Sequence, residues 1–141
     1  MIDDLGLLPT ISWFCRIFNQ TYPGIRIEQE IDIAEADIPE PLKIAIYRVT
    51  QEAMNNIAKH SKADLVHFSL RKQDARLELA IHDNGQGFSL EEMHSRKDTL
   101  KGLGLTNMKE RAALSGGSLN IESSQGKGTN IRAYWPLCEK D

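Results

Sequence analysis

With 141 residues, the chain is long enough for one domain whose hydrophobic core needs no disulfide or structural metal. Apolar residues make up 40% and charged residues 26%, which is typical of soluble globular proteins rather than of disordered or membrane-spanning ones. A net charge of −3 without a Lys/Arg block argues against a nucleic-acid partner. The opening Met-Ile-Asp-Asp lacks the features of a secretory signal, so we expect a cytoplasmic, reducing setting in which Cys15 and Cys138 are ordinary thiols.

The first half of the chain predicts a helix, a strand and a second helix. Apolar residues recur at helical spacing over residues 5–21, and the Tyr-Pro-Gly run at 22–24 ends that helix. A strand follows over residues 25–33. The prolines at 39 and 41 suit the first turn of a helix that continues to about His60, because the N–H that proline lacks has no helical partner there.

One flank of this second helix is polar and lies beside its apolar stripe. At about 100° per residue, the Asn56 side chain projects roughly 40° and the Glu52 side chain roughly 80° from the centre of the stripe, with Lys59 beyond them. Asn55 falls on the far side, so Asn56 is the better candidate for a site.

Two interpretations stay open for this polar flank. Most such pairs on helices are merely solvated. An amide beside an apolar stripe needs a partner, however, and the Asn56 oxygen suits Mg²⁺ held together with substrate phosphates. Lys59 would meet phosphate charge, whereas His60 would either pack on a base or ribose or be an ordinary surface histidine.

The second half of the chain predicts two β-hairpins separated by a helix. Strands at 64–71 and 75–83 form the first hairpin, and strands at 119–123 and 129–135 form the second. Between them, a polar segment from Ser89 to Lys101 precedes a Gly102-Leu103-Gly104 turn that opens a helix to about Leu114. The order of elements predicts an α/β (α+β) two-layer sandwich, in which about three helices cover one face of a mixed, mainly antiparallel sheet.

Asp83 ends its strand with the inward-facing parity of the preceding apolar residues, and Thr129 also points inward. An Asp before Asn-Gly is commonly just a turn former. The inward parity and the glycines of Asp83-x-Gly85-x-Gly87 favour instead a buried carboxylate, for which an adenine amino group is an apt donor.

Gly102-x-Gly104 at a helix start would offer free N–H groups and the positive end of a helix dipole to phosphate. A lone Gly-x-Gly commonly serves only as a flexible turn. Together with Gly85 and Gly87, however, these glycines bracket a polar segment of about fifteen residues, which is typical of a hinged lid over a nucleotide. Neither a Walker A loop nor a Rossmann fingerprint is present.

In this order, the motifs resemble the ATP-binding catalytic domain of sensor histidine kinases, in the fold group shared with gyrase, the Hsp90 chaperones and the MutL repair proteins. The run from Arg48 to Ser61 resembles the N box of that family, Asp83 to Phe88 its first glycine box, and Gly102 to Arg111 its second. Gly128-Thr129 with Pro136-Leu137 is similar to the terminal strand signature. Residues 3–8 and 108–111 are similar to the subfamily of nitrate and lipid-fluidity sensors. The resemblance covers nearly the whole chain, which is expected to be one domain, 1–141, with a Bergerat-type fold.

The resemblance implies roles for these residues. Asp83 would bind the adenine amino group, aided by Thr129 through water, and Asn56 would hold Mg²⁺. Lys59 and the second glycine box would contact the phosphates. Glu52, the acidic N-box residue, would act as a general base or polarise water, and would approach Mg²⁺ through water. The implied nucleotide-binding set is Asn56, Lys59, His60, Asp83, Gly85, Gly87, Gly102, Leu103, Gly104, Leu105 and Thr129.

The implied activity is transfer of the γ-phosphate of ATP to a histidine on a separate dimerisation domain. The full-length kinase would be homodimeric, anchored in a membrane, and coupled to a response regulator. An Arg-x-x-His-Asp-like acceptor sequence is absent from these 141 residues, so we expect ATP·Mg²⁺ binding without self-phosphorylation. Two alternatives stay open: an ATPase of the same fold, and a non-catalytic nucleotide-binding interaction module.

Overall fold

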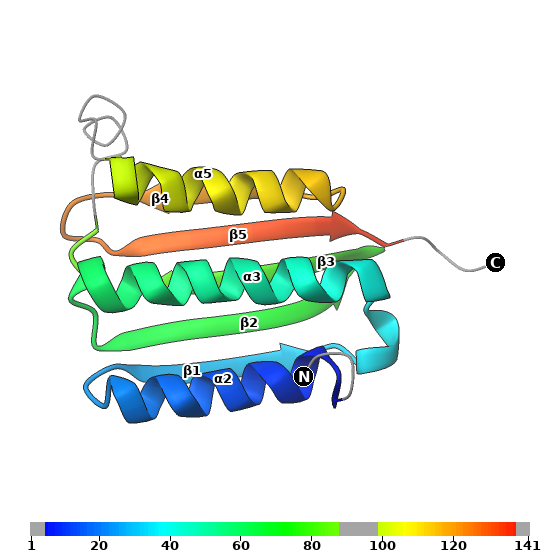
Figure 1. Ribbon diagram of the computed structural model, residues 1–141, viewed down its shortest axis with the longest axis horizontal. Helices are drawn as coiled ribbons and strands as arrows, with labels where there is room; N and C mark the ends of the chain where they lie inside the picture. The colour runs from blue at the N-terminus through cyan, green and yellow to red at the C-terminus, as the bar shows by residue number, and fades with distance from the viewer. Residues whose placement is uncertain (1–4, 88–98, 138–141) are drawn as a thin grey trace.

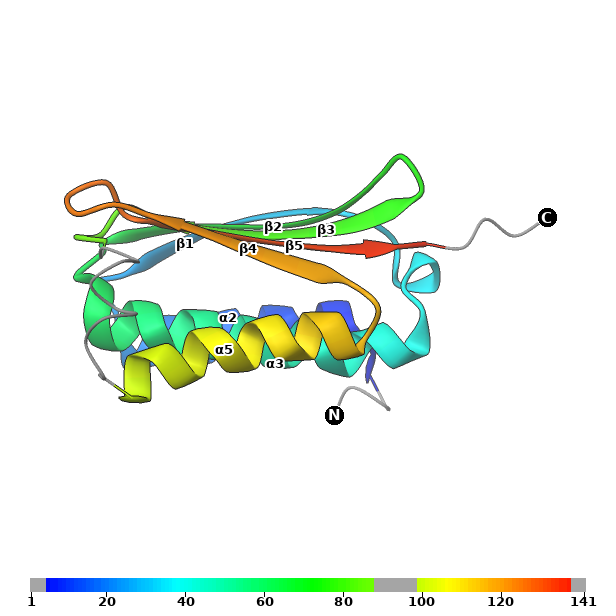
Figure 2. The same cartoon turned by 90° about the horizontal axis from the view of Figure 1, so that it is seen from above.

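The helices form one layer against one face of the sheet (Figure 1, Figure 2). The computed structural model describes residues 5–87 and 99–137, the side chains of 99–105 excepted. Within these residues, three α-helices cover one face of a five-stranded sheet, and no described element covers the other face. The helices are α2 (Leu7–Thr21), α3 (Glu40–Asn56) and α5 (Thr99–Leu114). The predicted two-layer α/β sandwich is confirmed.

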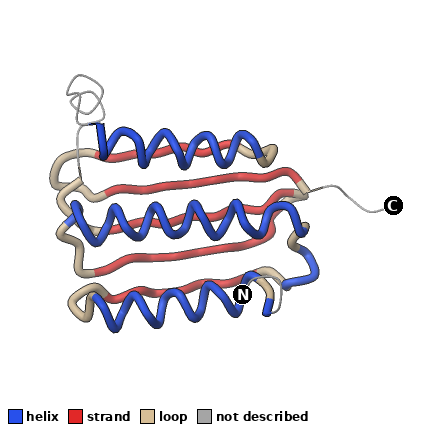
Figure 3. The backbone as a smooth tube through the Cα atoms, in the orientation of Figure 1, coloured by secondary structure: helices blue, strands red, loops and turns tan. Residues whose placement is uncertain are grey.

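The sheet is mixed because the helical connection through α3 joins two strands that are neighbours in it. The strands follow the order β1-β2-β3-β5-β4. β1 and β2 are parallel, since α3 crosses between them, whereas every later pair is antiparallel. Turns and loops therefore gather at the two ends of the strands (Figure 3). The strand bounds are Arg26–Asp32 for β1, Leu65–Gln73 for β2, Arg76–Asp83 for β3, Ser118–Ser123 for β4 and Thr129–Pro136 for β5.

Alternation along β3 and β5 buries the side chains that were expected to face the helices. Leu77, Leu79 and Ile81 are at most 1% exposed, and Asp83 continues this set at 2%. Thr129 lies opposite Asp83 in β5 and is 8% exposed. The predicted inward orientation of Asp83 and Thr129 is confirmed.

The apolar stripe of α2 holds this helix against the sheet and against α3. Ile11 and Cys15 are buried, and the Phe14 ring meets the Tyr47 ring of α3 edge-on, with centroids 6.0 Å apart. Burial raises the pKa of the Cys15 thiol to about 11, so this cysteine packs and does not react. Cys138 lies outside the described residues. None of the described helices combines the length and apolar character that crossing a bilayer requires.

A carboxylate distant in sequence fixes the N-terminal end of α2. Glu35, in the short turn η1 (Glu35–Asp37), accepts the N–H groups of Leu7 and Leu8, each at 2.8 Å. Lys43 of α3, whose side chain is 9% exposed, lies 2.9 Å from the Glu35 carboxylate and 2.7 Å from Glu40. These contacts satisfy N–H groups that a helix start leaves unpaired. They also tie α2 to α3.

Two element boundaries differ from the prediction. α5 already begins at Thr99, so Gly102 and Gly104 lie inside the helix and not in a turn before it. A helix tolerates glycine in its interior at a cost of about 1 kcal/mol relative to alanine. The hydrogen bonds of the helix that begins at Thr99 therefore continue through Gly102 and Gly104. The β2–β3 turn lies at Asp74 and Ala75, with φ of 52° and 54°, because strand pairing continues to Gln73. Residues 89–98 of the expected lid lie outside the described residues.

Candidate functional site

The predicted site residues come from elements that meet at one edge of the sheet. α3 ends there at Asn56 and continues as the π-helical turn η2 (Ile57–Ser61). β3 ends at this edge with Asp83, and β5 begins there with Thr129. In Figure 1 this edge is on the left, beside the start of α5. Four segments far apart in the sequence are thereby brought together.

Asp83 is a buried carboxylate at this edge. Its Oδ1 accepts the Gly85 N–H at 2.8 Å. Burial raises the pKa of Asp83 above its ordinary value, while the Gly85 N–H, the charge of His82 and the Thr129 backbone act in the opposite direction. A buried carboxylate is costly unless donors surround it, so this position suits a ligand that brings a further donor.

Glycines allow the backbone to press closely around Asp83. A Cβ on Gly85 would lie 2.2 Å from the Ser61 carbonyl oxygen and 2.8 Å from Asp83 Oδ1. A Cβ on Gly128, where φ is +78°, would lie 2.1 Å from the Asp83 carbonyl oxygen. The Gly85 N–H is engaged by Asp83 itself, so the first glycine box supplies close packing here and not an N–H free for a ligand.

The end of α3 presents polar side chains beside this carboxylate. Glu52 and Asn56 are half-buried, whereas Asn55 is exposed, which confirms that Asn56 lies on the core side of the helix. Lys59 and His60 follow in η2 and are exposed. Within the described part of the chain, neither the Asn56 amide nor the Glu52 carboxylate has a hydrogen bond or ion pair.

Asn56 and Glu52 offer two oxygen donors one helical turn apart. Mg²⁺ is usually held by one or two protein ligands together with substrate phosphates and water. Among residues 5–87 and 99–137, no group of three or more His, Cys, Asp or Glu side chains is placed to hold a metal. The donor set therefore fits a Mg²⁺ ion that arrives with a nucleotide better than a resident structural metal.

The second glycine box differs from its expected geometry. Gly102, Leu103, Gly104 and Leu105 lie within α5, near its start and at the same edge as Asp83. Because the helix begins at Thr99, Gly104 lies beyond its first turn, where a helical N–H is bonded to the preceding turn. The prediction of free N–H groups at both glycines is wrong for this helix. Their side-chain surroundings lie outside what the structure describes.

Asn84 holds the loop after Asp83 in place, a role that the sequence did not reveal. Its Oδ1 accepts the N–H groups of Asp64 and Leu65, both at 3.1 Å, and its Nδ2 donates to Asp64 Oδ1 at 2.6 Å. This clamp joins the loop after Asp83 to the start of β2. Asn-Gly is the signature of a turn, and nothing in it points to a partner twenty residues away.

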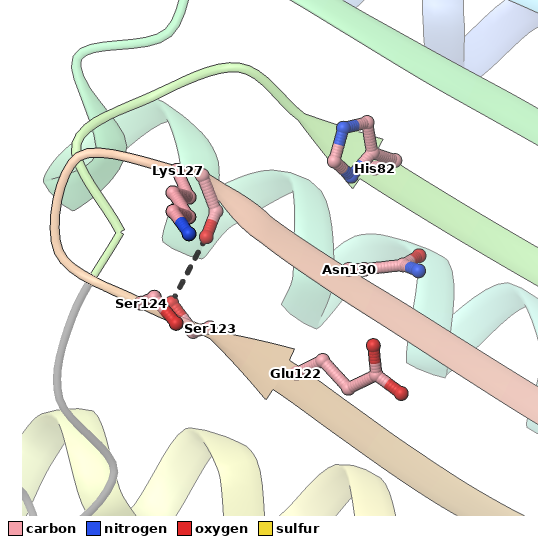
Figure 4. A pocket seen from close by; sticks show the side chains of 7 residues that line it. His82, Glu122, Ser123, Ser124, Lys127 and Asn130 are labelled. Atoms are coloured by element: carbon pink, nitrogen blue, oxygen red, sulfur yellow. Dashed lines mark hydrogen bonds between the residues drawn. The ribbon is translucent and has the colours of Figure 1, made fainter.

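A hollow of about 220 Å³ lies on the other face of the sheet at this edge (Figure 4). Since neighbours along a strand face opposite ways, His82 and Asn130 line this hollow while Asp83 and Thr129 face the helices. None of the residues predicted to bind a nucleotide contributes to it. The hollow is therefore a separate feature, lined by His82, Glu122, Ser123, Ser124, Lys127, Gly128 and Asn130.

Comparison with known proteins identifies the family. Residues 42–139 match the family described as histidine kinase-, DNA gyrase B- and HSP90-like ATPases. The chain belongs to this ATPase family. The sequence-based recognition of an ATP-binding domain of the histidine kinase type is confirmed.

Relatives within this ATPase family include named histidine kinases. The chain is 33% identical over 140 residues to the signal transduction histidine-protein kinase/phosphatase DegS of Brevibacillus brevis, covering 99% of this chain and 35% of that protein. It is 35% identical over 136 residues to the sensor histidine kinase LiaS of Bacillus subtilis, covering 96% of this chain and 36% of LiaS. The chain thus spans about a third of the length of these relatives.

Solved structures with the same fold are also histidine kinases. The blue-light activated histidine kinase of Erythrobacter litoralis EL346 superposes with a TM-score of 0.75 at 18% identity, covering 93% of this chain and 42% of that one. The mycobacterial sensor histidine kinase MprB gives a TM-score of 0.68 at 23% identity, covering 92% and 93%. These likenesses establish the fold of the ATPase family for this chain.

Proposed function

We propose that this chain binds ATP·Mg²⁺ and donates the γ-phosphate of ATP to a histidine on a separate dimerisation domain of a sensor histidine kinase. The family is one of ATPases, and the relatives DegS and LiaS are named as histidine kinases. The observation that carries the proposal is the buried Asp83 carboxylate, which ends β3 beside the polar end of α3.

Asp83 gives the site a preference for adenine. The amino group at position 6 of adenine is a donor and would meet the carboxylate, with Thr129 close by to hold a bridging water. Guanine carries a carbonyl oxygen at that position, which would face the carboxylate with two acceptors in contact. We therefore expect ATP to bind in preference to GTP.

The end of α3 would hold the phosphates and the reacting groups. Asn56 would bind Mg²⁺ through its carbonyl oxygen, and Lys59 with the start of α5 would contact phosphate oxygens. When bound, Mg²⁺ neutralises phosphate charge during transfer. An imidazole nitrogen of the acceptor would form a bond to the γ-phosphorus while the bond to the β,γ-bridging oxygen breaks and ADP leaves. Glu52 would take up the proton that the imidazole releases.

ATP binding with and without Mg²⁺ tests the assignment of the metal to Asn56. We expect Asn56→Ala to lose most of the gain in affinity that Mg²⁺ gives to the parent chain. Asn55→Ala is the matched control, since Asn55 is the exposed neighbour on the same helix. Equal Mg²⁺ dependence in the two variants would contradict the assignment.

Transfer itself is tested by supplying a histidine-bearing dimerisation domain in trans with γ-labelled ATP. We expect label on the acceptor histidine, none on this chain alone, and much less on the acceptor at limiting ATP when Asp83→Asn replaces the parent. Steady release of phosphate without an acceptor would favour the ATPase alternative. Nucleotide binding without any turnover would favour a non-catalytic module. In the full-length protein, the further partners would be a second kinase subunit and a response regulator, and the sensor would be anchored in a membrane.

A further inference from the structure

We infer that Gln86, in the loop after β3, is a positioning residue of the nucleotide site. It sets the place of the helix end that carries Lys59 and His60 relative to the Asp83 carboxylate. This inference rests on the proposed function, because it concerns how one nucleotide reaches both groups. Neither the turn signature of the loop nor the assignment of adenine to Asp83 gives Gln86 a role.

Gln86 makes two hydrogen bonds to the end of the long helix. Its side-chain Nε2 donates to the His60 carbonyl oxygen at 2.7 Å. Its backbone N–H donates to the Ser61 carbonyl oxygen at 2.6 Å. The last carbonyls of a helix have no partner within the helix, so a single residue satisfies two consecutive ones here.

The position of η2 depends on contacts from outside the helix. α3 changes from α-helical to π-helical geometry at Ile57, and η2 stops at Lys62, a non-glycine residue with the left-handed φ of 55°. Single π-helical turns are rare, and a changed hydrogen-bond register displaces the side chains that follow. Lys59 and His60 lie within this turn, so the contacts of η2 determine where both side chains begin.

The same residue also contacts the β4–β5 turn. The Gln86 carbonyl oxygen accepts the N–H of Gly126 at 2.6 Å. The glycines on either side of Gln86 allow this close packing. A Cβ on Gly85 would lie 2.2 Å from the Ser61 carbonyl oxygen, and a Cβ on Gly87 would lie 2.1 Å from the Ser124 carbonyl oxygen. Gln86, three residues after Asp83, therefore joins η2 to the hairpin that carries Thr129.

The two ends of a nucleotide should depend differently on this contact. Adenine would meet Asp83, whose position is set by strand pairing in β3 and does not require the Gln86 side chain. The phosphates would meet the end of the helix that carries Asn56 and Lys59, where that side chain holds the His60 carbonyl. Loss of the side-chain donor of Gln86 should weaken the binding of ATP and leave the binding of adenosine nearly unaffected.

The test compares ATP·Mg²⁺ and adenosine binding by calorimetry in the parent chain and in Gln86→Met and Gln86→Glu. Both substitutions keep the length of the side chain and the backbone N–H but remove the donor to His60. Gln73→Met is the control, because Gln73 is an exposed glutamine at the end of β2, where it pairs with the start of β3 and so lies at the opposite end of that strand from Asp83. We expect both Gln86 variants to bind ATP·Mg²⁺ roughly three- to tenfold more weakly, as for loss of one hydrogen bond. Adenosine affinity should stay within about twofold, and Gln73→Met should match the parent for both ligands.

Each result is decisive for one of the two proposals. Unchanged ATP·Mg²⁺ affinity in both Gln86 variants would overturn the positioning role and leave the proposed function intact. Equal weakening of ATP and adenosine would also overturn it, because Gln86 would then support only the fold of the loop. A parent chain that binds neither ligand would overturn the proposed function, and the positioning role with it.

Discussion

Two carboxylates, located near opposite ends of α3, show how differently this chain treats a negative charge. Glu35, near the start of α3, accepts two N–H groups of α2 and pairs with Lys43. Burial raises the pKa of Glu35, but the Leu8 and Leu7 N–H groups and Lys43 outweigh burial and hold the pKa below its ordinary value. Its charge stabilises the fold.

For Asp83, near the other end of α3, burial has a larger effect on the pKa than the hydrogen bonds that oppose it. It is 2% exposed, and burial raises its pKa despite the Gly85 N–H. Its charge costs stability in the free chain, because desolvation exceeds the compensation that the chain provides. A fold that retains such a group at the end of a strand is suited to bind a donor there. The comparison separates a carboxylate that holds the structure from one that awaits a ligand.

The largest expected effect is the loss of stability when a side chain is added to the loop that packs around Asp83. Gly85→Ala should lower the free energy of unfolding by about 3 kcal/mol, the upper part of the range for overpacking, because its Cβ would meet the Ser61 backbone and not a flexible side chain. Gly24→Ala is the control, since nothing lies within 4 Å of its added Cβ. Urea denaturation measures both. Equal stability of the two variants would show that the loop can open without loss.

Asp83→Asn should separate binding from stability. We expect ATP affinity to fall roughly 10- to 100-fold, the effect of losing a hydrogen bond to a charged group. The free energy of unfolding near neutral pH should be unchanged or higher, because the substitution removes a charge that is costly to bury. Calorimetry and urea denaturation give the two values. A variant that binds as tightly as the parent would disprove the adenine assignment, and a less stable variant would disprove the electrostatic cost.

Glu35→Ala should give the reverse pattern. The free energy of unfolding should fall by about 1 to 2 kcal/mol, as for removal of a helix N-cap, since the Leu7 and Leu8 N–H groups lose their acceptor. ATP affinity, measured where the chain is fully folded, should not change. Weaker ATP binding in this variant would mean that the two ends of α3 are coupled.

The smallest effect concerns pH. The contribution of Glu35 should be present above its ordinary pKa of 4.5 and be lost as pH falls through the lowered native value. For Asp83 the sign is opposite, since the native state keeps its proton to higher pH than the unfolded chain. Asp83→Asn should therefore match the parent below the ordinary pKa of 3.8 and exceed its stability as pH rises through the native value. Urea midpoints of the parent, Asp83→Asn and Glu35→Gln over roughly pH 3 to 7 would sharpen the contrast.

The sequence predicts those parts of the site that follow from periodicity. The alternation of β3 places Asp83 inward, and helical spacing separates half-buried Asn56 from exposed Asn55. Both depend only on the local period of side chains along a strand or a helix. The element order was likewise sufficient for the two-layer fold, because each amphipathic element has one face to bury.

Contacts between distant segments could not be predicted in this way. Glu35 caps a helix that lies 27 and 28 residues earlier, and Gln86 reaches a carbonyl 26 residues away. The start of α5 was misplaced for a related reason. Glycine marks a break in local propensity, but the continuation of a helix through Gly102 and Gly104 depends on the residues around them.

The length of α3, the helix that connects β1 to β2, also determines where a label can be attached without reaching the nucleotide site. α2 starts and β5 finishes at the edge opposite Asp83 (Figure 1). α3 separates the two edges with 17 residues, which corresponds to roughly 25 Å of helix. A fluorophore attached at the start of α2 or at the end of β5 would therefore lie at the ends of the strands opposite Asp83 and stay clear of bound ATP.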